Sequence, residues 1–274
     1  MKKPKDRGKA IDGQRFAQWV SRFPGYRQEV TEGRITNWIN QFTGGDRDIA
    51  ARVLDCVNYV SHESIEEVFE EILEKLDGWD RDERKRKGRW RFVAFSKAAG
   101  ESGDTMLHKL RTSTKMTGAK YEKLCIHKSD LLKEKLGPED NVVFLDDFAG
   151  TGNQVCTGWE QVMEELLPGE PNTYLILVAV TKTAIEKIQN QTPMQVMAHI
   201  KLRDEDNFFS GGCTHFTVQE KARILTYCRR ANNQFPRGYG DCGLVIVLAH
   251  RTPNNSIPIL HANHDAWVGL FARE

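Results

Sequence analysis

The sequence predicts an α/β fold, with a doubly wound, mainly parallel sheet that follows an N-terminal helical extension. After residue 88, short apolar runs rich in strand-forming residues alternate with helical segments. These runs are nearly continuous, which is typical of parallel strands covered on both faces. Before residue 88, apolar residues recur with helical spacing instead. We therefore expect an N-terminal helical region at residues 1–88 and an α/β domain at residues 89–274.

The N-terminal region is predicted to be helical because its apolar residues recur every three or four positions. Two segments share the pattern Arg-φ-x-x-Trp-φ-x-x-Phe, one starting at Arg15 and the other at Arg34. A third helix is expected over residues 49–60. Ser64 and Glu67 match a capping box, which predicts the start of a fourth helix.

A run of charged residues from Arg81 to Arg89 follows the fourth helix. Such a run is typical of a solvated turn or linker, and we place the domain boundary there. The alternative is a patch that contacts the phosphate backbone of a nucleic acid.

Five apolar runs in the second region are expected to form strands. They cover residues 91–95, 142–145, 174–180, 196–200 and 244–248. Right-handed crossovers through the intervening helices give a doubly wound sheet. Ligands of such sheets bind at the carboxyl ends of the strands, so functional residues are expected in the loops there.

The loop after the second of these strands carries the clearest chemical pattern. Gly150 and Gly152 allow backbone conformations closed to other residues. Their amides and the start of the next helix, with about half a positive charge, would cradle a phosphate, and Thr151 adds a hydroxyl. Asp146 and Asp147 need polar partners if they are buried. Two sugar hydroxyls, or hydroxyls with Mg²⁺, are suitable, so the pattern indicates a ribose 5-phosphate.

This segment resembles the signature of type I phosphoribosyltransferases, which bind 5-phosphoribosyl-1-pyrophosphate (PRPP) there. The resemblance implies that Asp146 and Asp147 are catalytic, hold the ribose hydroxyls, and bind Mg²⁺ directly or through water. It also implies that the phosphate is held by Ala149, Gly150, Thr151, Gly152, Asn153 and Gln154. Two hydroxyl residues of the family are replaced, because Gly150 stands where Thr or Ser is usual and Gln154 where Thr is usual.

A second loop lies where phosphoribosyltransferases keep their pyrophosphate loop. It follows the strand 91–95 and contains Ser96, Lys97, Ala98, Ala99 and Gly100. By resemblance, its amides and the catalytic Lys97 would hold the leaving diphosphate. Arg111, on the following helix, is a candidate substrate-binding residue.

Two other interpretations of the Asp146–Asp147 segment remain. It also resembles the Asp-x-Phe-x-Gly-x-Gly motif of S-adenosylmethionine-dependent DNA methyltransferases. Those enzymes need an acid after the next strand, which ends here in Val180-Thr181-Lys182, and a Pro-Pro loop, which the chain lacks. The plainer alternative is a tight strand-to-helix turn with a solvated acid pair.

The C-terminal part supplies further candidates for substrate binding. Tyr239 lies within Gly-Tyr-Gly-Asp-Cys-Gly, and Asn254 and Asn255 follow the last predicted strand. Clustered amides and hydroxyls suit the recognition of a base edge or a sugar. An Asx-rich turn is the alternative.

Composition narrows the class of protein. The 274 residues are 39% hydrophobic and 28% charged, with a formal net charge of +1. These values are typical of a soluble globular protein, and a polyanionic partner would need a local basic patch. The six cysteines form no Cys-x-x-Cys pair, and no apolar run is long enough to span a bilayer. We expect reduced thiols, no signal peptide, no membrane contact and a cytoplasmic location.

The wider pattern resembles the phosphoribosyltransferase-like proteins of bacterial conflict (anti-phage) systems. The resemblance rests on the Trp-φ-x-x-Phe helices, the Asp-Asp loop, the Gly-Tyr-Gly-Asp-Cys-Gly turn and the Thr-Pro-Asn-Asn-Ser segment. It implies a transferase of the phosphoribosyltransferase type that binds PRPP or a nucleotide with Mg²⁺, possible defence-system partners, and a bacterial cytoplasm. The alternatives are an inactive nucleotide or PRPP sensor and a nucleic-acid-associated module, with a methyltransferase as a minor one.

Overall fold

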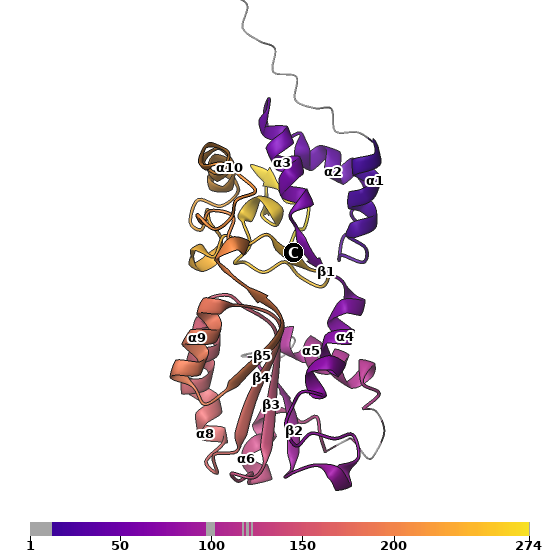
Figure 1. Ribbon diagram of the computed structural model, residues 1–274, viewed down its shortest axis with the longest axis vertical. Helices are drawn as coiled ribbons and strands as arrows, with labels where there is room; N and C mark the ends of the chain where they lie inside the picture. The colour runs from indigo at the N-terminus through magenta and orange to yellow at the C-terminus, as the bar shows by residue number, and fades with distance from the viewer. Residues whose placement is uncertain (1–12, 97–101, 117, 119–120, 122, 274) are drawn as a thin grey trace, which may run out of the picture. The chain divides into compact units, whose positions relative to one another are not determined.

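The computed structural model describes residues 13–96, 102–116, 118, 121 and 123–273 (Figure 1). Contacts divide the chain into two compact units. Unit 1 comprises Met1–His62 and Arg203–Glu274, and unit 2 comprises Glu63–Leu202. Both divisions fall at positions other than residue 88, so unit 1 is assembled from the two ends of the chain.

Unit 2 is built on a four-stranded parallel sheet. Its strands are β2 (Trp90–Ala94), β3 (Asn141–Ala149), β4 (Asn172–Thr181) and β5 (Gln195–Leu202), in the order β2-β3-β4-β5. Nearly every residue of β3 and β4 is buried, which explains their continuous apolar sequence. The predicted α/β fold with a parallel sheet is confirmed, and these strands match four of the five predicted runs.

A short segment beyond β2 makes the sheet doubly wound. The Phe92 amide donates to the Leu124 carbonyl at 2.6 Å, and the Ile126 amide donates to the Phe92 carbonyl at 3.1 Å. Cys125 therefore forms a parallel bridge on the outer edge of β2. The chain leaves β2 outward through α5 (Ser102–Ser113), then crosses back through α6 (Leu131–Glu134) to β3. The winding direction reverses between β2 and β3, which is where such sheets bind ligands.

Helices cover both faces of this sheet (Figure 1). Helices α4 (His62–Leu73) and α5 lie on one side, with Lys109 paired to Glu66 at 3.0 Å. The other face packs against α6, α7 (Asn153–Gly158), α8 (Glu164–Leu166) and α9 (Lys182–Gln191). A π-helical turn at Trp159–Met163 joins α7 to α8, so the predicted helix after the Gly-Thr-Gly turn is confirmed with one local widening.

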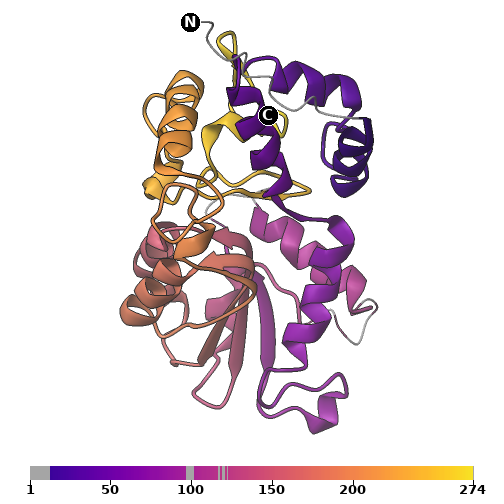
Figure 2. The ribbon, with the colours of Figure 1, turned by 45° about the horizontal axis from the view of Figure 1, so that its top comes forward.

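Unit 1 packs N-terminal helices against the C-terminal segment. Its helices are α1 (Gly13–Arg22), α2 (Glu32–Ile39), α3 (Asp46–Asp55) and α10 (Val218–Ala231). In Figure 2 the yellow C-terminal segment, with β7 (Asn263–His264) and β8 (Trp267–Val268), runs between α10 and the indigo helices. The indoles of Trp38 and Trp267 both donate to the Ile259 carbonyl, at 2.7 and 3.0 Å. The predicted Trp-containing helices are therefore confirmed as core elements.

Three local predictions are wrong. The third helix ends at Asp55, and its expected last turn is strand β1 (Asn58–Val60). That strand pairs in parallel with β6 (Ile246–Leu248), so the fifth apolar run belongs to a separate two-stranded sheet. Helix α4 begins at His62, which places Ser64 inside its first turn rather than at its cap. The first error arises because short apolar spacings fit a helix and a strand equally well. The second arises because a strand's partner is set by pairing between distant segments, and the third because a capping motif locates a helix start only approximately.

The charge run is a folded loop whose basic side chains have internal partners. The ion pairs are Arg81 with Glu70, Arg84 with Asp82, Lys87 with Asp77 and Arg89 with Asp140. Arg86 lies over the Trp79 ring, 4.6 Å from its centroid. Most of the positive charge in this run is therefore balanced within unit 2.

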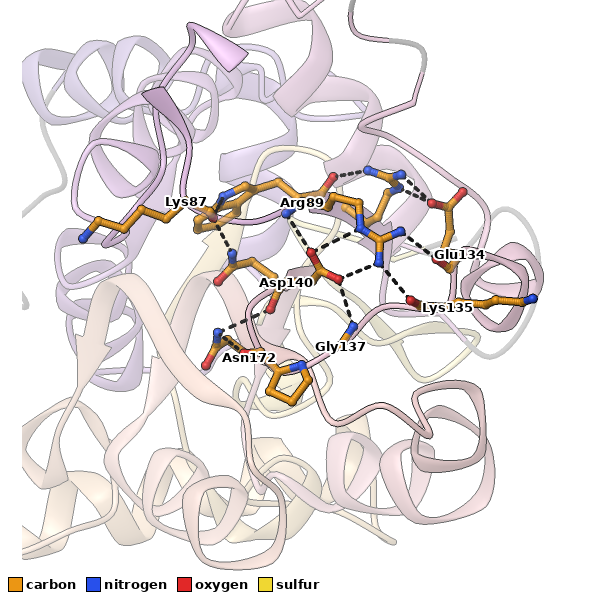
Figure 3. Close-up of polar contacts among 11 residues, drawn as sticks. Lys87, Arg89, Glu134, Lys135, Gly137, Asp140 and Asn172 are labelled. Atoms are coloured by element: carbon orange, nitrogen blue, oxygen red, sulfur yellow. Dashed lines mark hydrogen bonds and ion pairs between the residues drawn. The ribbon is translucent and has the colours of Figure 1, made fainter. Parts of the chain in front are cut away.

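A buried carboxylate ties the amino ends of β2 and β3 together (Figure 3). Asp140 is only 8% exposed and accepts hydrogen bonds from the backbone amides of Arg89 and Gly137, both at 2.8 Å. The Arg89 guanidinium donates to the same carboxylate and to the carbonyls of Glu134 and Lys135. This network lies at the amino ends of the strands, opposite the end where ligands are expected.

No helix among the residues that the structure describes is both long enough and apolar enough to cross a membrane.

Candidate functional site

Strand β3 positions the two predicted catalytic carboxylates. The strand extends through Ala149, so Asp146 and Asp147 belong to it rather than following it. Asp146 is 4% exposed, and Asp147 is partly buried. The Ser102 hydroxyl donates to Asp146 Oδ1 at 2.6 Å, and the Asp147 amide donates to the same oxygen at 2.9 Å. Ser102 begins α5, so strand β3 and the helix that follows β2 contribute to one site.

Burial, together with the neighbouring Asp147 carboxylate, raises the pKa of Asp146 well above its usual value near 3.8. Ionising both of two adjacent carboxyl groups in a buried setting costs a large free energy, because their negative charges repel each other. The arrangement therefore favours a pair that keeps one proton. Such a pair offers one donor and several acceptors, which suits two neighbouring hydroxyl groups.

We expect the Asp146→Asn variant to be more stable than the wild type near neutral pH. Because the folded pKa of Asp146 is raised, its contribution to the free energy of unfolding falls as pH rises from its usual pKa toward the folded one. Asparagine is neutral, and its amide oxygen accepts the same two hydrogen bonds. A gain of about 1 kcal/mol would raise Tm by roughly 2–4 °C. Thermal unfolding at neutral pH tests this, and a lower Tm for the variant would contradict it.

The Gly-Thr-Gly turn is held against α9. The Thr181 hydroxyl donates to the Gly150 carbonyl at 2.5 Å and accepts from the Ala184 amide at 3.0 Å, so one side chain links the turn to the start of α9. Gly152 has φ +74, and a Cβ there would lie 3.2 Å from the Ala184 carbonyl oxygen. The backbone therefore requires glycine at this position, both for its conformation and for the close approach.

The residues after this turn begin α7 and remain accessible. Asn153 and Gln154 are exposed, and the Thr151 hydroxyl accepts from the Asn153 amide at 3.4 Å. The ammonium group of Lys187, on α9, donates to Asn153 Oδ1. Sequence reasoning missed Lys187, because 34 residues separate it from Asn153 and only the packing of α9 brings it there. It also missed Ser102, whose position at the start of a helix was a usable signal.

The second predicted loop is described only at its first residue. Ser96 is buried, and the Lys128 ammonium group donates to its carbonyl. Lys97, Ala98, Ala99 and Gly100 lie outside the described residues. Arg111 and Ser96 both line a cavity of about 190 Å³ beside the carboxyl end of β2. Unit 2 thus brings Ser96 and Arg111 together, and their roles in binding remain predictions.

A family model named PRTase-CE matches residues 35–273, which cover both units. The chain belongs to the PRTase-CE family. This family is phosphoribosyltransferase-like, which agrees with the parallel sheet and with the sequence-based expectation. No curated protein matches the chain.

In this PRTase-CE chain, the three C-terminal candidates lie in unit 1 and contact one another. The Asn255 amide group donates to the Tyr239 carbonyl at 2.9 Å, and the Tyr239 amide donates to the Asn254 carbonyl at 2.8 Å. Asn255 is buried and is used to hold the glycine-rich turn, whereas Asn254 is exposed. Recognition of a base or sugar by these residues stays a prediction.

Asp146 and Asp147 are the carboxylates that the described part of strand β3 offers to a divalent cation at the PRTase-CE site. The described part of the chain contains no group of three or more side chains suited to hold a metal ion. Mg²⁺ is commonly held by one or two carboxylates together with water and substrate phosphates. Asp146 and Asp147 fit that pattern, provided that a phosphorylated ligand supplies the remaining oxygens.

Proposed function

We propose that this PRTase-CE protein binds a ribose-5-phosphate donor, PRPP or a nucleotide, together with Mg²⁺. One observation carries the proposal: a buried acid pair and a glycine turn against a helix start share the ligand-binding end of a doubly wound sheet. Asp146 and Asp147 would hold the ribose hydroxyls. Ala149 to Gln154 would hold the 5-phosphate through backbone amides. Ser96 to Gly100, with Lys97, would hold the diphosphate.

The reaction that suits this arrangement is transfer of the phosphoribosyl group. The bond between C1 and the diphosphate oxygen breaks, its electron pair leaves with the diphosphate, and the acceptor forms the new bond to C1. A charged Asp147 lowers the energy of the positive charge that develops on the ribose ring. Bound Mg²⁺ would neutralise part of the charge on the leaving diphosphate.

A PRPP or nucleotide sensor is the second candidate. Glycine at position 150 and glutamine at position 154 supply no hydroxyl to a phosphate, which leaves Thr151 with the remaining hydroxyl of the turn. A nucleic-acid-binding role is less favoured, because the basic side chains of residues 81–89 are largely paired within unit 2. The resemblance noted above supports a place for this chain in bacterial anti-phage defence, in the cytoplasm.

Calorimetry and product analysis test the proposal directly. We expect PRPP to bind the full-length chain in the presence of Mg²⁺ and to bind more weakly when EDTA removes the cation. Release of diphosphate from bound PRPP would identify a transferase or hydrolase, whereas binding without release would identify a sensor. Absence of binding for both PRPP and ribonucleotides would overturn the proposed function.

We expect Lys187→Met to weaken the binding of a 5-phosphorylated ligand by about tenfold, because it removes a positive charge beside the turn. Lys182→Met is the matched control. Lys182 lies on the same helix, and its ammonium group is 3.6 Å from Glu186 Oε1. Calorimetry with PRPP measures both variants. Equal affinities for the two would show that Lys187 does not contact the phosphate region.

A further inference from the structure

The cavity beside the carboxyl end of β2 is a candidate for a binding site of its own ligand. It has a volume of about 190 Å³ and opens between helix α5 and the edge segment at residues 125–128. Its lining is mixed, with apolar, cationic, acidic and thiol groups: Ala94, Ser96, Asp104, Leu107, Arg111, Cys125, Ile126, His127 and Lys128. Sites for drug-sized ligands have volumes of roughly 300–1,000 Å³. This cavity therefore suits a compact ligand.

Positive groups reach the cavity from both of its sides. Arg111 comes from α5 and is exposed, and no hydrogen bond or ion pair is recorded for its guanidinium among the described residues. Lys128 comes from the edge segment, and Asp104 of α5 adds one carboxylate to the lining. A cavity wall of low polarity strengthens the field of such charges, because less water screens them.

The thiol of Cys125 lies in the lining of the same cavity. Burial raises the pKa of Cys125 to about 11, while the positive charge of Arg111 acts in the opposite direction. The charge of Arg111 is thus felt at a poorly solvated part of the cavity. Ala94, Leu107 and Ile126 add apolar surface around this position.

We propose that this cavity is a binding site for a small anion, a carboxylate or a phosphate ester with a compact apolar body. The guanidinium of Arg111 pairs with the anionic group, since its planar fork matches two oxygens at once. Lys128 adds charge from the opposite side, His127 can hydrogen-bond to the ligand, and Leu107 and Ile126 contact the apolar body. The site borders the loop proposed to hold the diphosphate, because Ser96 belongs to both, and Arg111 is also a candidate substrate-binding residue, so this inference rests on the proposed function.

The neighbourhood of Ser96 connects this site to the rest of unit 2. Lys128 donates to the Ser96 carbonyl, and both residues line the cavity. A bound anion attracts the same ammonium group. Its binding would therefore act on the backbone directly before Lys97, which gives the ligand a route to regulate the chain.

Ligand-observed NMR of the full-length chain tests the proposal, with benzoate and inorganic phosphate as probes and with EDTA and no PRPP. We expect at least one probe to bind the wild type, with affinity about tenfold lower in Arg111→Gln and an intermediate value in Arg111→Lys. Arg84→Gln is the control, because Arg84 is exposed and paired with Asp82 elsewhere in unit 2. Leu107→Trp should fill the cavity and prevent binding while the circular dichroism spectrum stays unchanged.

The probes also separate the possible ligands and the two sites. Binding of benzoate that phosphate does not displace indicates a carboxylate ligand, and binding of phosphate alone indicates a phosphate ester. Phosphate held at the Gly-Thr-Gly turn would be lost in Lys187→Met and kept in Arg111→Gln, which would overturn the proposal. Binding of neither probe, or equal binding in Arg111→Gln and wild type, would also overturn it. None of these results depends on whether PRPP binds at Asp146 and Asp147.

Discussion

The double variant Asp146→Asn, Asp147→Asn is expected to lose PRPP binding, with an affinity at least about a hundredfold below that of the wild type. A hydrogen bond to a charged group contributes about 1.5–3 kcal/mol, and the charged carboxylate of the pair would accept from ribose hydroxyls. Replacing both acids also removes the two side chains proposed to contact Mg²⁺. Calorimetry with PRPP and Mg²⁺ measures the loss.

The fold of this double variant is expected to be intact. Asparagine at position 146 accepts the hydrogen bonds from Ser102 and from the backbone amide at position 147, so the local geometry is kept. A second double variant, Asp77→Asn with Asp82→Asn, replaces two carboxylates by amides on the surface of unit 2 and should bind PRPP normally. Unchanged binding in the Asp146, Asp147 variant would remove the basis of the donor-site assignment.

The largest loss of stability is expected for Asp140→Asn, with a decrease of about 2–3 kcal/mol in the free energy of unfolding at neutral pH. Burial alone would raise the pKa of Asp140, but the hydrogen bonds from Arg89 and Gly137 outweigh it and lower the pKa below its usual value. The variant keeps one acceptor oxygen and loses the charge that Arg89 faces (Figure 3). The expected decrease in the free energy of unfolding is moderate because the Arg89 side chain is about half exposed and water screens its charge.

The pH dependence of this effect has a defined sign. A carboxyl group with a lowered folded pKa stabilises the protein above its unfolded pKa, and the contribution is lost as pH falls through the folded value. The difference between wild type and Asp140→Asn should therefore disappear in strong acid. Urea denaturation at several pH values measures it. Asp130→Asn, which breaks an exposed pair with Lys133, should leave the free energy of unfolding nearly unchanged. Equal effects of the two variants would contradict the prediction.

The sequence predicted the parallel sheet of unit 2 well, because buried parallel strands are continuous apolar runs of sufficient length. The prediction from sequence was wrong where the apolar runs were short. Residues 58–60 have a spacing that also fits a helix, and the partner strand β6 lies far away in the sequence. The strand nature of such a segment comes from pairing, which a local pattern does not contain.

The residues of the candidate site also fall into those that the sequence predicted and those that it did not. Asp146, Asp147 and the glycine turn were predictable, since strand, loop and helix are consecutive in the sequence. Lys187 and Ser102 were not recognised, because each reaches its partner only through the packing of a separate helix. The alternative role of residues 81–89 in nucleic-acid binding is less favoured for a related reason, since the carboxylate partners of this run include Glu70 and Asp140, which lie outside it.

The discontinuous composition of unit 1 has a consequence for synthesis of the chain on the ribosome. Unit 2 spans Glu63–Leu202, so all of its residues emerge before the last part of unit 1 is translated. Domains generally fold as units during translation. The N-terminal helices of unit 1 therefore cannot complete their aromatic core until Trp267 and Phe271, in the last part of the chain, have been translated. A stalled or truncated product would carry a complete sheet and an exposed set of N-terminal aromatic side chains, which are surfaces that chaperones and proteases recognise.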